Sequence, residues 1–175
     1  MISKPGQTDK AIFVIDQQGT CYIAKCWGPR HERASNTECT VYEGLSELRP
    51  GGYDVFVNMI LAGNILCSNL SPGERTIALP YKVGQVLTRI WNDLNDRERT
   101  HVREECEKAI HIFRSLSIRV PDIGKHNVPY ERNTAAVTIL DFKTAMECPQ
   151  SEHVPYVELL LLFGDPVMRG RTSGG

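Results

Sequence analysis

The stretch NDRERTHVREECEKAIHIF, residues 95–113, decides the fold class. Asn95 followed by Glu98 forms the pattern of a capping box, in which two side chains satisfy backbone N–H groups at the start of a helix. Apolar side chains then recur every three or four residues, as one buried helix face requires. These residues are Val102, Cys106, Ala109, Ile110 and Phe113. The sequence therefore predicts a long amphipathic helix with one core-facing stripe.

A second helical pattern lies just before this stretch. Residues 83–94 place apolar side chains at the same spacing, and Pro80 stands ahead of them, close to the expected helix start. Because the connection between the two patterns is short, we expect the two amphipathic helices to pack as a pair.

Strand patterns precede the helices. Residues 11–15 and 20–26 predict a hairpin whose turn, residues 16–19, ends in glycine. The composition of residues 27–38 is typical of a loop, and we expect a short strand over residues 39–42.

The longest predicted strand follows a Pro-Gly-Gly turn at residues 50–52. Alternating apolar side chains place it over residues 53–61, and residues 75–79 can return antiparallel to it. Residues 121–134 form the largest internal loop and are too polar for the core. Three more strands are expected at residues 118–120, 135–142 and 154–163. This order predicts an α+β fold, an antiparallel β-sheet packed on one face by the pair of amphipathic helices.

Length and composition predict a single globular domain, residues 11–166, between flexible tails at residues 1–10 and 167–175. Hydrophobic residues make up 41% of the chain, which excludes disorder throughout, and a net charge of -1 argues against a protein built mainly around nucleic acid. The chain shows neither a secretory signal pattern nor an apolar run near the ~20 residues of a spanning helix. We therefore expect a soluble or membrane-peripheral protein of the cytoplasm.

Four possible metal ligands gather in one part of the sequence: Cys21, Cys26, His31 and Cys39. Zinc sites bring their first two cysteines together in a turn. Cys21 and Cys26 instead share a predicted strand with opposite parity, which directs their sulfur atoms to opposite faces. We expect no metal ion and no cofactor.

A thiol nucleophile at Cys106 would need a nearby base. His101 and His111 lie five residues to either side, and five positions rotate a helix by about 500°, which leaves the side chains about 140° apart. We therefore interpret Cys106 as a core residue and assign no catalytic residue to this helix.

No phosphate-binding glycine loop, dinucleotide fingerprint or nucleophile elbow occurs in the sequence, so we expect a protein that is not an enzyme. The alternative is a small cytoplasmic enzyme with its site in the loop of residues 121–134, where His126 and Asp122 would act together.

Basic residues suggest a contact surface for nucleic acid or anionic membrane. Lys25, Arg30 and Arg33 cluster near the first predicted loop, with Arg169 and Arg171 in the C-terminal tail. Val167 and Met168, beside them, could serve as an apolar anchor for self-association or for a membrane. A module that binds RNA, such as a silencing suppressor, is a further alternative.

The segment YDVFVNMILAGNILC, residues 53–67, together with the two helices that follow, resembles the globular part of rhabdovirus matrix proteins, especially the shorter, plant-infecting type. This resemblance implies a non-enzymatic viral structural protein of the cytoplasm or the virion. Such a protein associates with itself, condenses the ribonucleoprotein through viral nucleocapsid proteins, and contacts an anionic membrane during virion assembly. The chain departs from the animal-virus pattern because it lacks the lysine-rich N-terminal arm and a Pro-Pro-x-Tyr motif.

Overall fold

The computed structural model describes residues 10–47, 54–64, 75–149 and 156–164. The predicted tails, apart from Lys10, lie outside these residues. The described part is an α+β protein, as the sequence predicts. The chain divides into two compact units. Unit 1 comprises Met1–Lys82 with Asp141–Thr144, and unit 2 comprises Val83–Leu140 with Ala145–Gly175.

Unit 1 contains an antiparallel sheet with the strand order β1-β2-β4-β3. Its strands are β1 (Lys10–Gln17), β2 (Thr20–Trp27), β3 (Leu61–Asn64) and β4 (Arg75–Pro80). The predicted hairpin is confirmed, and its two turn residues, Gln18 and Gly19, have φ of 57° and 83°. Two consecutive positive φ values match the twist of a two-residue hairpin, and glycine adopts them without strain.

A helix stands where the sequence predicts a loop and a short strand. The segment begins with η1 (Pro29–His31) and continues as α1 (Glu32–Glu47), which packs on β4. One face of α1 is buried, and it carries Ser35, Glu38, Cys39, Val41, Tyr42 and Leu45. The prediction was wrong because two members of this face, serine and glutamate, are polar and hide the helical period.

The long strand predicted over residues 53–61 is also wrong. Residues 54–55 form a turn, and Val55, Phe56 and Val57 are all buried, so the side chains do not alternate between two faces. Among the described residues, Leu61–Asn64 of β3 pair with β4, which confirms the return strand, but β3 overlaps the predicted strand only at Leu61. The segment that resembles the matrix proteins therefore contains a strand of four residues among those described.

The centre of unit 2 is α3 (Asp96–Ser115), which begins with the predicted capping box between Asn95 and Glu98. All five residues of the predicted stripe are buried. The preceding helix is much shorter than predicted, because residues 83–94 divide into three short elements. They are β5 (Gln85–Val86), α2 (Leu87–Ile90) and η2 (Trp91–Asp93).

The rest of unit 2 is made of short elements. They are β6 (Ile118–Arg119), η3 (Lys125–Asn127), β7 (Pro129–Glu131), β8 (Ala136–Val137) and β9 (Met146–Glu147). The strand predicted at 118–120 is confirmed, whereas the one at 135–142 is reduced to β8. Residues 121–134 are not the exposed polar loop that was predicted, because Ile123, Val128 and Tyr130 are buried.

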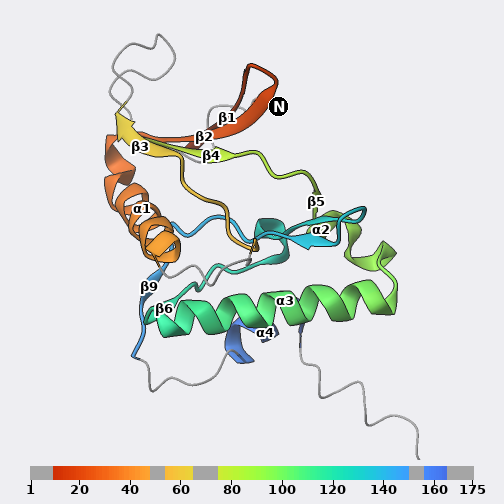
Figure 1. Cartoon of the computed structure of the whole chain (residues 1–175). Helices are drawn as coiled ribbons and strands as arrows, with labels where there is room; N and C mark the ends of the chain where they lie inside the picture. Colours follow the sequence, from red (N-terminus) through yellow and green to blue (C-terminus); the bar gives the residue numbers. More distant parts are fainter. Residues whose placement is uncertain (1–9, 48–53, 65–74, 150–155, 165–175) are drawn as a thin grey trace, which may run out of the picture. The chain divides into compact units, whose positions relative to one another are not determined.

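The last predicted strand, residues 154–163, is a helix over its described part, α4 (Tyr156–Phe163), which lies against α3 (Figure 1). A short apolar run does not by itself distinguish a buried strand from a helix, and its four leucines favour the helix. Glu158 and Leu162, four residues apart, are both buried, and Gly164 follows with φ of 75°, a common way to end a helix.

Candidate functional site

A buried ion pair joins a strand to a helix in unit 1. The ammonium of Lys25, on β2, contacts the carboxylate of Glu38, on α1, and their side chains are 6% and 0% exposed. Lysine and glutamate are almost never fully buried unless they are paired, because both charges lose their hydration. Each of the two charges in this pair is therefore acceptable at its buried position because the other is present.

The surrounding elements hold both partners in place. Lys25 sits in the middle of β2, opposite Ile12 of β1 and Ile77 of β4, so its backbone is fixed from both sides. Glu38 belongs to the buried face of α1. Lys25 was predicted as part of an exposed basic cluster, and this is corrected: its side chain points to the α1 partner.

Residues 141–144, distant in sequence, pack with unit 1. The ring of Phe142 is fully buried and meets the ring of Tyr42 edge-on, with centroids 4.9 Å apart. Tyr42 lies one helical turn after Glu38. Burial raises the pKa of the Tyr42 phenol well above its usual value, and the negative charges of Glu38 and Asp141 raise it further. Both carboxylates therefore lie within electrostatic reach of the same phenol.

Asp141 has an unusual backbone conformation, with φ of 71°. This left-handed region is costly for a residue with a side chain, and such residues collect at functional sites. The carboxylate of Asp141 is mostly covered, and its Oδ2 lies 3.0 Å from the Nζ of Lys143. Lys25, Glu38 and Asp141 thus form an unusual charged set within unit 1.

A second polar group lies in unit 2, in and before η3. The Asn127 side chain is buried, and its Nδ2 donates to the backbone carbonyl of Asp122 at 3.1 Å. The Asp122 carboxylate is half-exposed, and its Oδ1 lies 3.7 Å from Nε2 of His126. This distance is too long for a hydrogen bond. The predicted partnership of His126 with Asp122 therefore amounts to a contact between two exposed side chains.

The other predicted contact residues have different outcomes. Arg30 and Arg33 are exposed, but they lie in η1 and α1 rather than in a loop. Four predicted residues lie outside the described part of the chain: Val167, Met168, Arg169 and Arg171. No helix within the described ranges combines the length and the apolar character needed to cross a bilayer.

The cysteines and histidines of the described residues form no metal or nucleophile site. Among the described residues, no three side chains of the metal-binding types are positioned to share an ion. Burial raises the pKa of the Cys106 thiol to about 12, which leaves it un-ionised and a poor nucleophile at neutral pH. His101 does not serve it as a base, because its Nε2 lies 2.8 Å from the carbonyl oxygen of Ala135.

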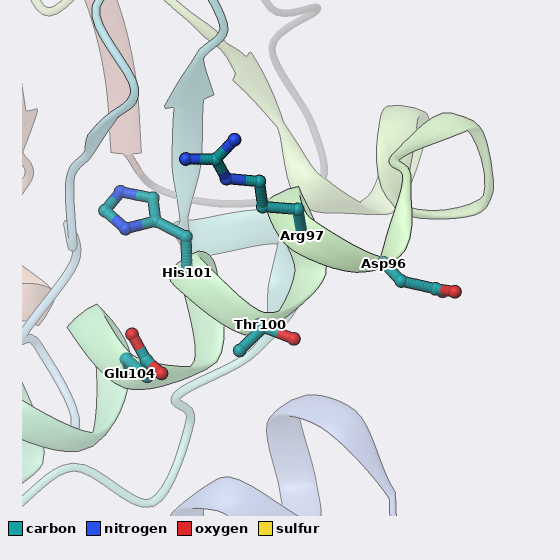
Figure 2. A pocket seen from close by; sticks show the side chains of 5 residues that line it. All are labelled: Asp96, Arg97, Thr100, His101 and Glu104. Atoms are coloured by element: carbon teal, nitrogen blue, oxygen red, sulfur yellow. The ribbon is translucent and has the colours of Figure 1, made fainter.

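One open hollow of about 480 Å³ lies along the first turns of α3. Figure 2 shows its lining side chains, all from this one helix: Arg97 and His101 extend to one side, and Asp96 points away. Because the charged groups diverge, the hollow offers no converging set for catalysis.

No protein-family model matches the chain. No curated protein matches it either.

A sequence signal for the charged set does exist. Lys25 follows Ile23-Ala24 in a strand, Asp122 and Asn127 form an Asp-x-x-x-x-Asn pattern, and Asp141-Phe142 comes later in the chain. Each pattern alone is short and common. The Lys25 and Asp141-Phe142 patterns become informative only when the structure shows Lys25 paired with Glu38 and residues 141–144 packed in the same unit.

Proposed function

We propose that this chain binds the phosphate groups of a nucleoside triphosphate with the residue set that protein kinases use. In kinases, a strand lysine in a Val-Ala-Ile-Lys motif contacts the phosphates and pairs with a helix glutamate. An Asp-x-x-x-x-Asn catalytic loop and an Asp-Phe-Gly motif follow. The present chain has counterparts in the same order: Lys25 with Glu38, Asp122 with Asn127, and Asp141 with Phe142.

The buried pair of Lys25 and Glu38 carries the proposal. Replacing such a pair by apolar residues of similar size is often neutral or stabilising, so stability alone does not explain it. An ammonium has three N–H donors. When Glu38 accepts one of them, the others remain able to bind phosphate oxygens, and Glu38 fixes the direction in which they point.

The other residues fit defined roles in such chemistry. Asp141, in unit 1, matches the carboxylate that holds a divalent cation in kinases. A bound magnesium ion would neutralise the charge of the phosphates. Asp122 matches the carboxylate that accepts the proton of a hydroxyl substrate, and its half-exposed side chain is open to solvent. Of the two residues in the predicted enzyme alternative, Asp122 therefore has a role in the proposed function and His126 has none.

Departures from the kinase pattern limit the proposal to nucleotide binding, and the first is that Ile23-Ala24 precedes Lys25 where that pattern has Ala-Ile. Val120 and Pro121 stand where the catalytic loop has histidine and arginine, Lys143 stands where Asp-Phe-Gly has glycine, and the sequence contains no Gly-x-Gly-x-x-Gly loop. Asp122 would serve phosphoryl transfer to a hydroxyl group. The rate of that transfer is measured separately from nucleotide binding.

Calorimetric titration of the protein with ATP tests the proposal, once with Mg²⁺ and once with EDTA. We expect saturable binding in at least one condition, and a loss of at least tenfold in affinity in the double variant Lys25→Met/Glu38→Leu. That variant removes both charges together, so it avoids a lone buried charge. Lys108→Met, which removes an exposed lysine on α3, is the matched control. If ATP produced no heat of binding with Mg²⁺ or with EDTA, the proposed nucleotide-binding function would be refuted.

A structural, matrix-like role is a second candidate, favoured by the edge strand β3. Ile60 and Leu61 lie at this edge and are 49% and 55% exposed. An exposed apolar edge is a template for pairing with another chain. A concentration series in sedimentation velocity, with Leu61→Lys as the disrupting variant, tests self-association. Co-sedimentation with anionic vesicles and with ribonucleoprotein tests the other predicted partners, and a monomer indifferent to both would exclude this role.

A further inference from the structure

Lys143 contacts the carboxylate of Asp141, which is the group that would bind a metal ion under the function proposed above. Its Nζ lies 3.0 Å from Oδ2 of Asp141, and the two side chains are 33% and 15% exposed. At this distance the contact is a charge-assisted hydrogen bond, which is stronger than one between neutral groups. The carboxylate is therefore already matched by a positive charge from its own chain.

The backbone fixes this arrangement. Phe142, between the two residues, is fully buried against Tyr42 and Phe56. Because the residue in the middle cannot move without opening the core of unit 1, Asp141 and Lys143 are both anchored close to it. The positive φ of Asp141 is kept although an aspartate rarely adopts it, which indicates that packing imposes this geometry.

From this geometry we infer that Lys143 takes the place of the divalent cation, so that the chain binds a nucleoside triphosphate without metal. The inference rests on the nucleotide-binding function proposed above. In kinases the residue after Asp-Phe is glycine, and the aspartate is left to hold magnesium against the phosphates. In this chain the side chain at that position delivers an ammonium to the same carboxylate.

The chemistry of an ammonium suits this role. Lysine supplies three N–H donors and no acceptor. One donor reaches Asp141, and the others remain for phosphate oxygens, so the ammonium bridges carboxylate and phosphate as a metal ion does. The exposed third of the Lys143 side chain leaves it open to a ligand from solvent. Lys25 adds a second positive charge within the same unit.

Fluorescence titration with N-methylanthraniloyl-ATP tests this inference in EDTA and in excess Mg²⁺. For the unmodified chain we expect dissociation constants that agree within threefold between the two conditions. Lys143→Met should bind at least tenfold more weakly in EDTA and regain affinity with Mg²⁺, because the Lys143 ammonium then no longer competes with the ion for the Asp141 carboxylate. Lys143→Arg keeps the charge and should retain binding in EDTA, and Lys108→Met serves as the matched lysine control.

The outcomes separate the two proposals. Binding of the unmodified chain in Mg²⁺ but not in EDTA would overturn the role of Lys143 and leave the nucleotide-binding function standing. Unchanged affinity of Lys143→Met in EDTA would also overturn it. Absence of binding in both conditions refutes the function itself. In a Trp91→Phe background, emission from Trp27, buried in unit 1, shows whether each variant is folded before its affinity is compared.

Discussion

Two lysine–glutamate pairs in this protein have the same chemistry and opposite surroundings. Lys25 and Glu38, from a strand and a helix of unit 1, have side chains 6% and 0% exposed. Lys108 and Glu105 lie one turn apart on α3, with side chains 58% and 21% exposed and Nζ 2.7 Å from Oε1. Water solvates the second pair whether or not it forms, whereas the first pair exists only because each charge has the other. The location of an ion pair, and not its presence, therefore decides how much its loss costs.

The largest effect should come from breaking the buried pair. In Lys25→Met, Glu38 loses its lysine partner at a buried position, and loss of one partner of a buried pair costs about 3–5 kcal/mol. Urea unfolding followed by Trp27 emission measures this loss. The Trp91→Phe background assigns the signal to unit 1, because the chain has two tryptophans and each unit contains one.

The double variant Lys25→Met/Glu38→Leu is the control for that loss. With no charge left in the site, we expect most of the lost stability to return, since two apolar side chains of similar volume can fill the same space. Nucleotide binding should not return with it. A double variant as unstable as the single one would mean that the site needs the ion pair for packing, which would remove the argument that the pair is kept for a ligand.

A third pair, in unit 2, lies between these extremes. Arg114 of α3 contacts Glu158 of α4, with side chains 12% and 2% exposed, and Arg114 also donates to the Ile118 carbonyl at 2.7 Å. Arg114→Met should cost about 3 kcal/mol, the low end for buried pairs, because the arginine is not fully covered. Trp91 reports the change, since its ring packs against Phe163 of α4 at 4.9 Å. Unaltered Trp91 emission and unfolding would show that α4 stays docked through apolar contacts alone.

The contrast between α3 and α1 explains what the sequence could predict. In α3 every residue of the buried stripe is apolar or cysteine, so the period of 3.6 residues is visible and the predicted helix, cap and core are confirmed. In α1 the buried face includes Glu38 and Ser35, which a hydrophobic pattern counts as surface. The residue that makes Glu38 acceptable in the core is Lys25, on another element. No local pattern contains that information, so the helix and the candidate site were missed together.

The Cys106 thiol, unlike Lys25 and Glu38, is buried without an oppositely charged partner. Its contribution to stability therefore depends on pH. Burial raises the pKa of Cys106 to about 12, from 9.0 in an unstructured chain. The stability that this shift contributes is complete below pH 9 and is lost as the pH rises towards 12, because only the unfolded thiol ionises. Between pH 8 and 10 we expect a loss of about 1.4 kcal/mol from this group. Chemical denaturation at several pH values measures it.

Cys106→Ala separates this contribution from other alkaline effects. The alanine variant will be less stable at every pH because a cavity remains, but its free energy of unfolding should fall less steeply between pH 8 and 10. Tyr42, whose pKa is also raised by burial, adds a similar decline at higher pH in both proteins. Parallel curves for the two proteins would show that Cys106 is not the group responsible.

The smallest effect is expected for Lys108→Met. Removal of this ammonium leaves Glu105 next to solvent, where water replaces the lost partner, so the midpoint of urea denaturation should stay where it is. Raising the salt concentration should reduce any small difference between the two proteins further, because salt screens exposed charges. If Lys108→Met lowered the midpoint as far as Lys25→Met does, burial would not be the property that separates the two pairs. The buried pair would then give no reason to look for a ligand, and the functional proposal would have to stand on the Asp122 and Asp141 patterns alone.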